Sequence, residues 1–238
     1  MEPVEQIRAS RPHPPCQRPL VTISYAQSLD GSIAVRGDAP LALSCPETKL
    51  MTHALRSVHD AILVGINTVL ADDPKLTARR VGGPHPRPVV LDTRLRFPDA
   101  ARLLHHPQGV IIATGPEPSP ERVQALRDQG ATVLPLPRAD EGVDVLALLQ
   151  ELAKMGICSL MVEGGARVLT SFLRARLGDW LVLTVTPHLV GGVHALSGPT
   201  VVAHVPPAQV DMFPGLQAWH WTPMGRDMVV WGRMAWPA

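Results

Sequence analysis

A dense polar cluster follows an apolar run in the segment AILVGINTVLADDPKLTARR, residues 61–80. Within it, Thr68, Asp72 and Arg79 supply a hydroxyl, a carboxylate and a guanidinium at short spacing. A carboxylate can assist proton transfer, and a guanidinium binds phosphate through charge-assisted hydrogen bonds. The alternative is that ADDP only forms a turn before Pro74, because Asp is common in turns.

A second candidate segment is EGGARVLTS, residues 163–171. Gly164 and Gly165 allow a sharp turn and a close approach of the backbone to a ligand. A helix that begins near Ala166 would point free N–H groups at that ligand, which favours an anion such as phosphate. Two glycines also occur in ordinary strand-to-helix turns, so the pair alone is a weak signal.

The third candidate segment is DTRLR, residues 92–96, which directly follows an apolar run. Its Thr93, Arg94 and Arg96 suit a terminal phosphomonoester, such as the 2′-phosphate of NADPH. Without further support, the alternative of solvated surface charge would be preferred.

Strands and helices alternate along the chain and would position these three segments. Short apolar runs indicate strands covered on both faces, at residues 20–26, 61–65, 88–92, 109–115, 131–136 and 158–165. Helices are predicted between them, after residue 45 and over residues 119–130, 143–156 and 166–178. The segment 179–192 follows, and 216–222 with 227–236 indicate a closing antiparallel hairpin. The predicted fold class is α/β, with a mostly parallel central sheet, helices on both faces and a C-terminal antiparallel hairpin.

The first of these helices is predicted from a local start signal. Ser44 and Glu47 have the spacing of a capping box, in which each side chain bonds the other residue's backbone N–H. Apolar side chains then recur every three or four residues until the helix ends near His59. In such α/β sheets ligands bind beyond the carboxyl ends of the strands, where all three candidate segments lie.

Composition limits the class of protein. The chain has 238 residues, 45% of them hydrophobic, and a net charge of +1, which predicts no general attraction to nucleic acid or membrane. The first eighteen residues lack the apolar segment of a signal peptide, and no apolar run could span a bilayer, so a cytoplasmic location is expected. We expect a flexible tail over residues 1–18 and a single domain over 19–238.

The cysteines and histidines show no metal-binding pattern. Cys16, Cys45 and Cys158 are odd in number and far apart, which predicts reduced thiols and argues against a disulfide. The ten histidines include no pair with metal-ligand spacing, so no metal site is predicted.

Several segments resemble the signature segments of the riboflavin-biosynthesis pyrimidine reductases. They are VTISYAQSLDGSIA, LRSVHDAILVGINTVLADDPKLTAR, PVVLDTRLRFP and LMVEGGARVLTSFLRARLGDWLVLTVTPHLVGG, which occur in order between about Leu20 and Gly192. The resemblance implies a dihydrofolate-reductase-like fold, NADPH as cofactor and a homodimer. It also implies reduction of a ribosylaminopyrimidine phosphate, in which the sugar ring opens to an imine and hydride reaches C1.

The resemblance also implies roles for single residues. Thr68 and Asp72 correspond to positions that hold the nicotinamide half of NADPH, and Asp72 is the candidate catalytic group. Ala26 would contact the nicotinamide amide, and Thr93 with Arg94 would face the 2′-phosphate. The cofactor diphosphate would lie against Gly164, Gly165, Ala166, Arg167, Val168, Leu169, Thr170 and Ser171. The substrate would contact Arg56, Leu76, Arg79 and Glu163.

The chain departs from the family pattern between the first strand and the first helix. Relatives often have a Ser and a Trp where this chain has Ala39 and Leu41. Ala39 cannot supply a hydroxyl and Leu41 cannot stack, so either Ser44 substitutes or the substrate differs. The H-x-E and P-C-x-x-C motifs of the zinc deaminase domain, which many bacterial members carry, do not occur in this sequence.

Three functions therefore remain open. The first is the pyrimidine reductase of riboflavin synthesis, acting on 5-amino-6-(5-phosphoribosylamino)uracil or its 2,5-diamino analogue. The second is an NADPH-dependent reductase of a pterin, a folate-like compound or another imine. The third is a non-catalytic nucleotide-binding paralogue, which the retained TVLADDPKLTAR segment argues against.

Overall fold

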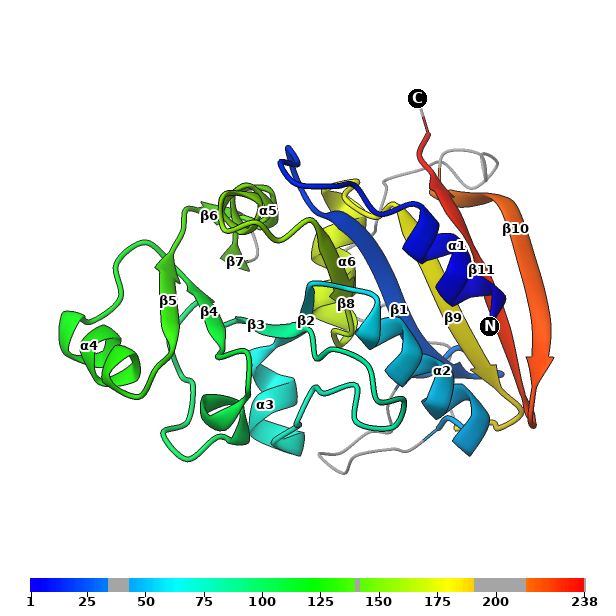
Figure 1. Ribbon diagram of the computed structural model, residues 1–238, viewed down its shortest axis with the longest axis horizontal. Helices are drawn as coiled ribbons and strands as arrows, with labels where there is room; N and C mark the ends of the chain where they lie inside the picture. The colour runs from blue at the N-terminus through cyan, green and yellow to red at the C-terminus, as the bar shows by residue number, and fades with distance from the viewer. Residues whose placement is uncertain (34–42, 140–141, 191–212, 238) are drawn as a thin grey trace.

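One sheet forms the centre of the protein (Figure 1). The structure is a computed structural model that describes residues 1–33, 43–139, 142–190 and 213–237. The sheet contains β1 (Leu20–Ser28), β2 (Ala61–Gly65), β3 (Arg87–Leu91), β4 (Ile111–Thr114), β5 (Thr132–Pro135), β8 (Ser159–Val162), β9 (Trp180–Thr186), β10 (Gly215–Met224) and β11 (Asp227–Ala235). Their order is β10-β11-β9-β1-β8-β2-β3-β4-β5. Neighbouring strands from β9 to β5 run parallel, and β11 runs antiparallel to both β9 and β10.

Helices cover both faces of this sheet. They are α1 (Glu2–Ala9), α2 (Pro46–Ser57), α3 (Ile66–Asp72), α4 (Pro120–Asp128), α5 (Val145–Lys154) and α6 (Ala166–Arg174). On one face, α5 and α6 bury apolar side chains against β1, β2 and β8. On the other, α3 and α4 pack over β2 to β5, and α1 and α2 pack over β9 and β11 (Figure 1). This arrangement confirms the predicted α/β architecture.

Three smaller elements were not predicted from the sequence. The helix α3 occupies part of the polar cluster described above, for which no helix was predicted, and a short 3-10 helix, η1 (Arg102–His105), follows β3. A two-stranded hairpin consists of β6 (Arg138–Ala139) and β7 (Gly142–Val143). None of the helices in the described residues has the length and apolar character needed to cross a bilayer.

The N-terminal segment is not the flexible tail that we expected. It forms α1, whose Val4 and Ile7 are buried in the same apolar cluster as α2. The side chain of Gln6 accepts a hydrogen bond from Trp231 Nε1 of β11 at 3.3 Å. The helix therefore belongs to the packed structure, while a single domain over residues 19–238 stays a prediction.

The expectation of three reduced cysteines is also wrong. Cys16 and Cys158 form a disulfide across a sequence separation of 142 residues. It joins the segment before β1 to the start of β8, and these two strands are neighbours in the sheet. Cys45 is free and buried. The odd number of cysteines is explained by Cys45, which stays unpaired. The spacing of the cysteines in the sequence could not show that Cys16 and Cys158 lie close together in the fold.

The start of α2 is stabilised by the last strand, and the predicted capping box does not form. The N-cap residue is Cys45, whose side chain makes no capping bond. Instead, the buried Asp227 of β11 accepts hydrogen bonds from the Cys45 N–H at 2.7 Å and the Thr48 hydroxyl at 2.6 Å. Burial alone would raise the pKa of Asp227, but these hydrogen bonds outweigh it and hold the pKa below its usual range.

We predict that Asp227→Ala lowers the free energy of unfolding by about 1–3 kcal/mol, because it leaves buried donors unpaired. Since the folded-state pKa of Asp227 is depressed, its contribution is present at pH 7. That contribution is lost as the pH falls below about 3.9, the usual Asp value, and through the folded-state pKa. Urea unfolding at pH 7 and at acid pH measures both effects.

The matched control for this variant is Asp128→Ala, which removes an exposed carboxylate from the end of α4. It should leave the free energy of unfolding nearly unchanged. If the two variants unfolded at the same urea concentration as the parent protein, Asp227 would not stabilise the start of α2.

Candidate active site

The carboxyl ends of the central strands lie at one edge of the sheet. The register pairs Gly65, the last residue of β2, with Leu91, the last residue of β3. Leu63 of β2 pairs with Val162 of β8, and the Glu163 N–H donates to the Leu63 carbonyl at 2.9 Å. The three candidate segments of the sequence begin directly after these strands. The register therefore brings them together, as the parallel arrangement predicted.

Two cavities lie at this edge and meet each other. The first, of about 530 Å³, is lined by residues that include Ala26, Asp72 and Glu163. The second, of about 540 Å³, is lined by residues that include Thr93 and Arg167. Thr68 of α3 and Gly165 before α6 line both. Two ligands, one in each cavity, would thus meet at these two residues.

The two glycines before α6 have different roles. A Cβ atom at Gly164 would lie 2.3 Å from Val168 Cβ, so only glycine lets the end of β8 approach the first turn of α6. Gly65 meets the same side chain, because a Cβ there would lie 2.9 Å from Val168 Cγ2. A Cβ at Gly165 would meet no atom within 4 Å. Crowding explains Gly164, whereas Gly165 leaves open space before the free N–H groups of the helix.

The two adjacent aspartates after Ala71 are used differently. Asp73 ends α3 in the left-handed conformation, with φ of 38°. Its carboxylate accepts a hydrogen bond from the Arg102 N–H at 2.8 Å and pairs with the Arg102 side chain. Asp72 is exposed, lines the first cavity and has no hydrogen-bond or ion-pair partner among the described residues. Asp73 is therefore the turn residue, and the Asp72 carboxylate is available to a ligand.

Arg56 and Glu163 bind each other across the first cavity. Arg56 Nε donates to Glu163 Oε1 at 2.7 Å, and Arg56 Nη2 donates to Oε2 at 2.6 Å. Burial would lower the pKa of Arg56, but the facing carboxylate outweighs it and raises that pKa. Arg56 also donates to the Thr77 carbonyl at 3.3 Å. Both residues line the cavity, but the charge of each is largely balanced by the other.

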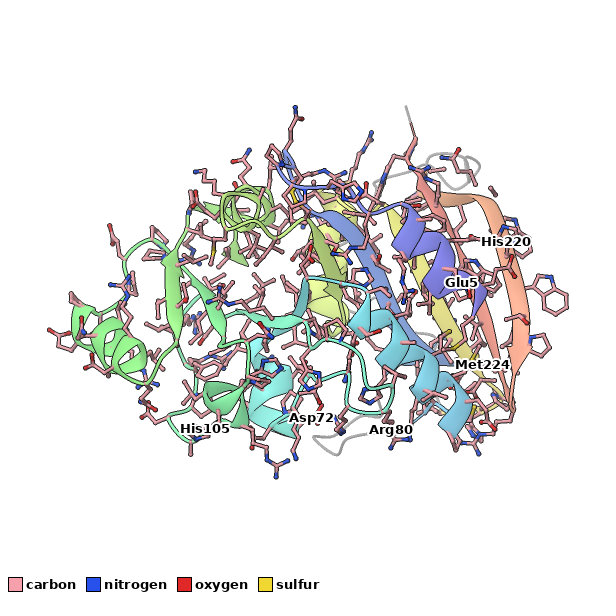
Figure 2. The ribbon with its side chains drawn as sticks, in the orientation of Figure 1. Glu5, Asp72, Arg80, His105, His220 and Met224 are labelled. Atoms are coloured by element: carbon pink, nitrogen blue, oxygen red, sulfur yellow. A yellow bond between two sulfur atoms is a disulfide. The ribbon has the colours of Figure 1, made fainter. Side chains whose placement is uncertain are left out.

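Three further cations line the first cavity: Lys49, Arg79 and Arg80. Figure 2 shows Arg80 and Asp72 along the same edge of the molecule. The neighbouring His53 reports the local field, since its pKa is lowered to about 4 by burial and by the charges of nearby arginines. His53 is therefore neutral near pH 7. The described lining of this cavity carries more positive than negative charge, which suits an anionic ligand.

The second cavity is strongly cationic. Its lining includes four guanidinium groups, those of Arg94, Arg96, Arg138 and Arg167. The carboxylate in the same lining, Asp92, is fully buried, and burial raises its pKa. A raised pKa means that the buried site disfavours the charged carboxylate. The cavity thus suits a ligand with more than one phosphate group.

Some predicted contact residues do not line either cavity. Leu76 is buried in the core, with a positive φ of 47°, and can only shape the loop that carries Arg79. Leu169 and Thr170 are buried on the inner side of α6. By contrast, most of the predicted cofactor contacts line one or both cavities: Ala26, Thr68, Thr93, Arg94, Gly164, Gly165, Ala166, Arg167, Val168 and Ser171. The segment with Ala39 and Leu41 lies outside the described residues, and Ser44 lines the first cavity.

Of a polar stripe on α2, sequence reasoning predicted Arg56 and missed Lys49, Thr52 and His53. All four line the first cavity, and they follow the i, i+3, i+4, i+7 spacing of one helix face. The same periodicity that predicted the apolar face of this helix could have found them. Arg80 and Arg138 were also missed, and Arg138 had no signal because its hairpin was not predicted.

Within the described residues, no group of three or more His, Cys, Asp or Glu side chains could hold a metal ion.

Comparisons with known proteins agree with this geometry. The family described as RibD C-terminal domain matches residues 19–230. The 2,5-diamino-6-ribosylamino-4(3H)-pyrimidinone 5′-phosphate reductase of Methanothermobacter thermautotrophicus is 40% identical over 178 residues, which cover 74% of this chain and 81% of the relative. The riboflavin biosynthesis protein RibD of Aquifex aeolicus is 35% identical over 176 residues, 74% of this chain but only 48% of that protein.

The solved structure of riboflavin biosynthesis reductase Rib7 from Saccharomyces cerevisiae is also similar. It superposes with a TM-score of 0.71 at 31% identity, covering 92% of this chain and 91% of the yeast chain. The family match extends from before β1 to residue 230, within β11, and includes every segment that lines the two cavities. The chain therefore belongs to the riboflavin-biosynthesis pyrimidine reductases, as a member of the RibD C-terminal domain family.

Proposed function

We propose that this chain uses NADPH to reduce a ribosylaminopyrimidine 5′-phosphate to its ribitylamino product in riboflavin biosynthesis. The observation that carries the proposal is that two cationic cavities meet at Thr68 and Gly165. Hydride transfer needs donor and acceptor carbons in contact, and both molecules are phosphorylated. Relatives named as reductases of the 2,5-diamino pyrimidinone phosphate favour that substrate over the 2-oxo analogue.

The residues of the second cavity fit NADPH. The open space at Gly165 and the free N–H groups at the start of α6 suit a diphosphate. Thr93 and Arg94, which line the same cavity, suit the 2′-phosphate. The nicotinamide would then lie near Thr68, Asp72 and Ala26, where the two cavities join. When bound, the cofactor supplies a hydride to C1 of the opened sugar.

The first cavity fits the phosphorylated substrate. Because Arg56 is held by Glu163, we assign the substrate phosphate mainly to Arg79, with support from Arg80 and Lys49. Arg56 contributes by fixing the Glu163 carboxylate, which is then placed to accept hydrogen bonds from the substrate. Leu76 shapes the loop through its backbone. Ser44 lines the same cavity and can supply the hydroxyl that Ala39 lacks.

Asp72 is the candidate catalytic group. Opening of the sugar ring breaks the bond between C1 and the ring oxygen, which takes a proton from water. The nitrogen keeps its own N–H, so a protonated imine forms at C1 and C1 becomes a better hydride acceptor. The unpaired Asp72 carboxylate can accept a hydrogen bond from that N–H group and stabilise its positive charge. Hydride addition to C1 then leaves a neutral amine, which is the ribitylamino group. This route needs no nucleophilic side chain.

The test is an NADPH-oxidation assay, followed by the loss of absorbance of the reduced cofactor. The substrates are both ribosylaminopyrimidine phosphates and, beside them, dihydrofolate. We expect turnover with at least one pyrimidine, and more efficient use of NADPH than of NADH. Turnover of dihydrofolate alone would support the alternative reductase function. Nucleotide binding without any turnover would support a non-catalytic paralogue.

Two variants separate substrate binding from chemistry. Arg79→Ala should mainly raise KM, because it removes a phosphate contact present in both ground and transition states. We expect a fall in kcat/KM of roughly 10- to 150-fold, from about 1.5–3 kcal/mol for a charge-assisted hydrogen bond. Asp72→Asn should mainly lower kcat, because the amide keeps the size of the side chain but loses its negative charge.

Asp73→Asn is the matched control for Asp72→Asn, since the two side chains are adjacent and only Asp72 lines the cavity. The control should keep its kcat even if its stability falls slightly. A fully active Asp72→Asn enzyme would remove Asp72 from the chemistry, and an unchanged KM in Arg79→Ala would remove the phosphate site.

We also propose that the enzyme is a homodimer that buries β10. This edge strand carries the exposed Trp219 and Trp221, at 57% and 59% of their full exposure (Figure 2 marks the neighbouring His220). Trp231, by contrast, is buried in the core of the chain. Large exposed aromatic side chains on an open strand edge are typical of an interface.

Light scattering at micromolar concentration should give the mass of a dimer, and Trp219→Glu with Trp221→Glu should shift it to that of a monomer. A monomeric parent protein would exclude the proposal.

A further inference from the structure

The β6–β7 hairpin lies directly against Thr93 in the second cavity. Arg138 of β6 pairs with Val143 of β7, and Gly142 has a φ of +150°. A Cβ atom at Gly142 would lie 3.0 Å from Thr93 Oγ1, so a larger residue would crowd that hydroxyl. Glycine at this position therefore lets the hairpin backbone approach the loop that follows β3.

The stem of Arg138 lies beside the same loop. Gly115, at the end of β4, donates its N–H to the Thr93 carbonyl at 3.2 Å. A Cβ atom at Gly115 would lie 2.9 Å from that carbonyl oxygen and 4.0 Å from Arg138 Cγ. The side chain of Arg138 thus leaves the hairpin next to Thr93, and both residues line the cavity.

Both side chains are free to bind a ligand. Among the described residues, Arg138 makes no hydrogen bond or ion pair, and the Thr93 hydroxyl has no hydrogen-bond partner. Arg96 is partly engaged, because its Nη2 donates to Asn67 Oδ1 at 2.9 Å. Arg167 belongs to the first turn of α6, a different element from the β6–β7 hairpin and the loop that carries Thr93. A free hydroxyl and a free guanidinium side by side can bind a phosphomonoester together.

We propose that Arg138 is a specificity-determining residue, which joins Thr93 and Arg94 in binding the 2′-phosphate of NADPH and so helps to select it over NADH. The inference rests on the proposed function, because it assigns a residue to the cofactor end of the same site. It goes beyond that function in naming the hairpin as the element that reads the 2′-phosphate. The guanidinium supplies charge and two donors, and Thr93 supplies a third donor from the neighbouring loop.

The test uses adenosine 2′,5′-bisphosphate and adenosine 5′-monophosphate, which differ only in the 2′-phosphate, titrated calorimetrically at low salt. The parent protein should bind the bisphosphate more tightly. Arg138→Ala should weaken bisphosphate binding by about tenfold or more, as expected for loss of one charge-assisted contact. Its affinity for the monophosphate should change by less than about twofold, which also shows that the variant is folded.

The matched control is Arg8→Ala, which removes an exposed arginine from α1. Arg8 lines neither cavity. It should bind both nucleotides as the parent does. Arg138→Lys should keep part of the preference, because lysine keeps the charge but loses the planar pair of donors.

The outcomes separate this inference from the proposed function. If the parent protein binds the two nucleotides equally, the assignment of NADPH to the second cavity is wrong. If the parent discriminates and Arg138→Ala discriminates equally well, the cofactor assignment stands and the role of Arg138 is overturned. If Arg138→Ala and Arg8→Ala lose bisphosphate affinity to the same extent, the effect is one of net charge and Arg138 is not the specific contact. Loss confined to Arg138→Ala supports the inference.

Discussion

The close approach of α6 to the ends of β2 and β8 is the constraint on which the rest of the site depends. Val168 occupies the space that side chains at Gly65 and Gly164 would need. With that contact made, the first N–H groups of α6 face the edge of the sheet, and Gly165 remains open beside them. Because α3 begins directly after Gly65, the same contact fixes where Thr68 lies relative to α6. The two cavities thus meet at Thr68 and Gly165 because glycine at residues 65 and 164 lets α6 pack closely against the sheet.

Charge at the site is arranged locally in a protein that is almost neutral overall. The bidentate pair of Arg56 and Glu163 places a fixed carboxylate inside a cavity that is otherwise positive. The pair with Arg56 offsets the negative charge of Glu163 beside a phosphorylated ligand and fixes the orientation of its carboxylate. The lowered pKa of His53 also indicates a positive environment, because burial and the neighbouring arginines favour its neutral form. Each charged group therefore has either a partner in the protein or space for one in a ligand.

The sequence was sufficient wherever the signal was local. Apolar runs punctuated by Gly and Pro predicted most strands and helices of the sheet, and the positions after those strands predicted the segments that line the cavities. Two of the failures depended on contacts distant in sequence. Asp227, which binds the start of α2 in place of the capping box, lies 179 residues after Thr48 in the sequence. The disulfide joins Cys16 and Cys158 across 142 residues. The helix α3 was missed because its seven residues are too few for a clear periodic pattern. The β6–β7 hairpin, with Arg138, has too short a ladder to show alternation.

The position of β1 in the sheet has a consequence for how the chain folds as it is synthesised. Although β1 is the first strand to leave the ribosome, its neighbours are β8 and β9, made more than a hundred residues later. The strands β2 to β5 are adjacent in both sequence and space, so they can assemble earlier as a local unit. During that interval the apolar β1 has no partner and is exposed to association with other nascent chains. Closure of the sheet around β1 is therefore a non-local event that must follow the synthesis of β8 and β9.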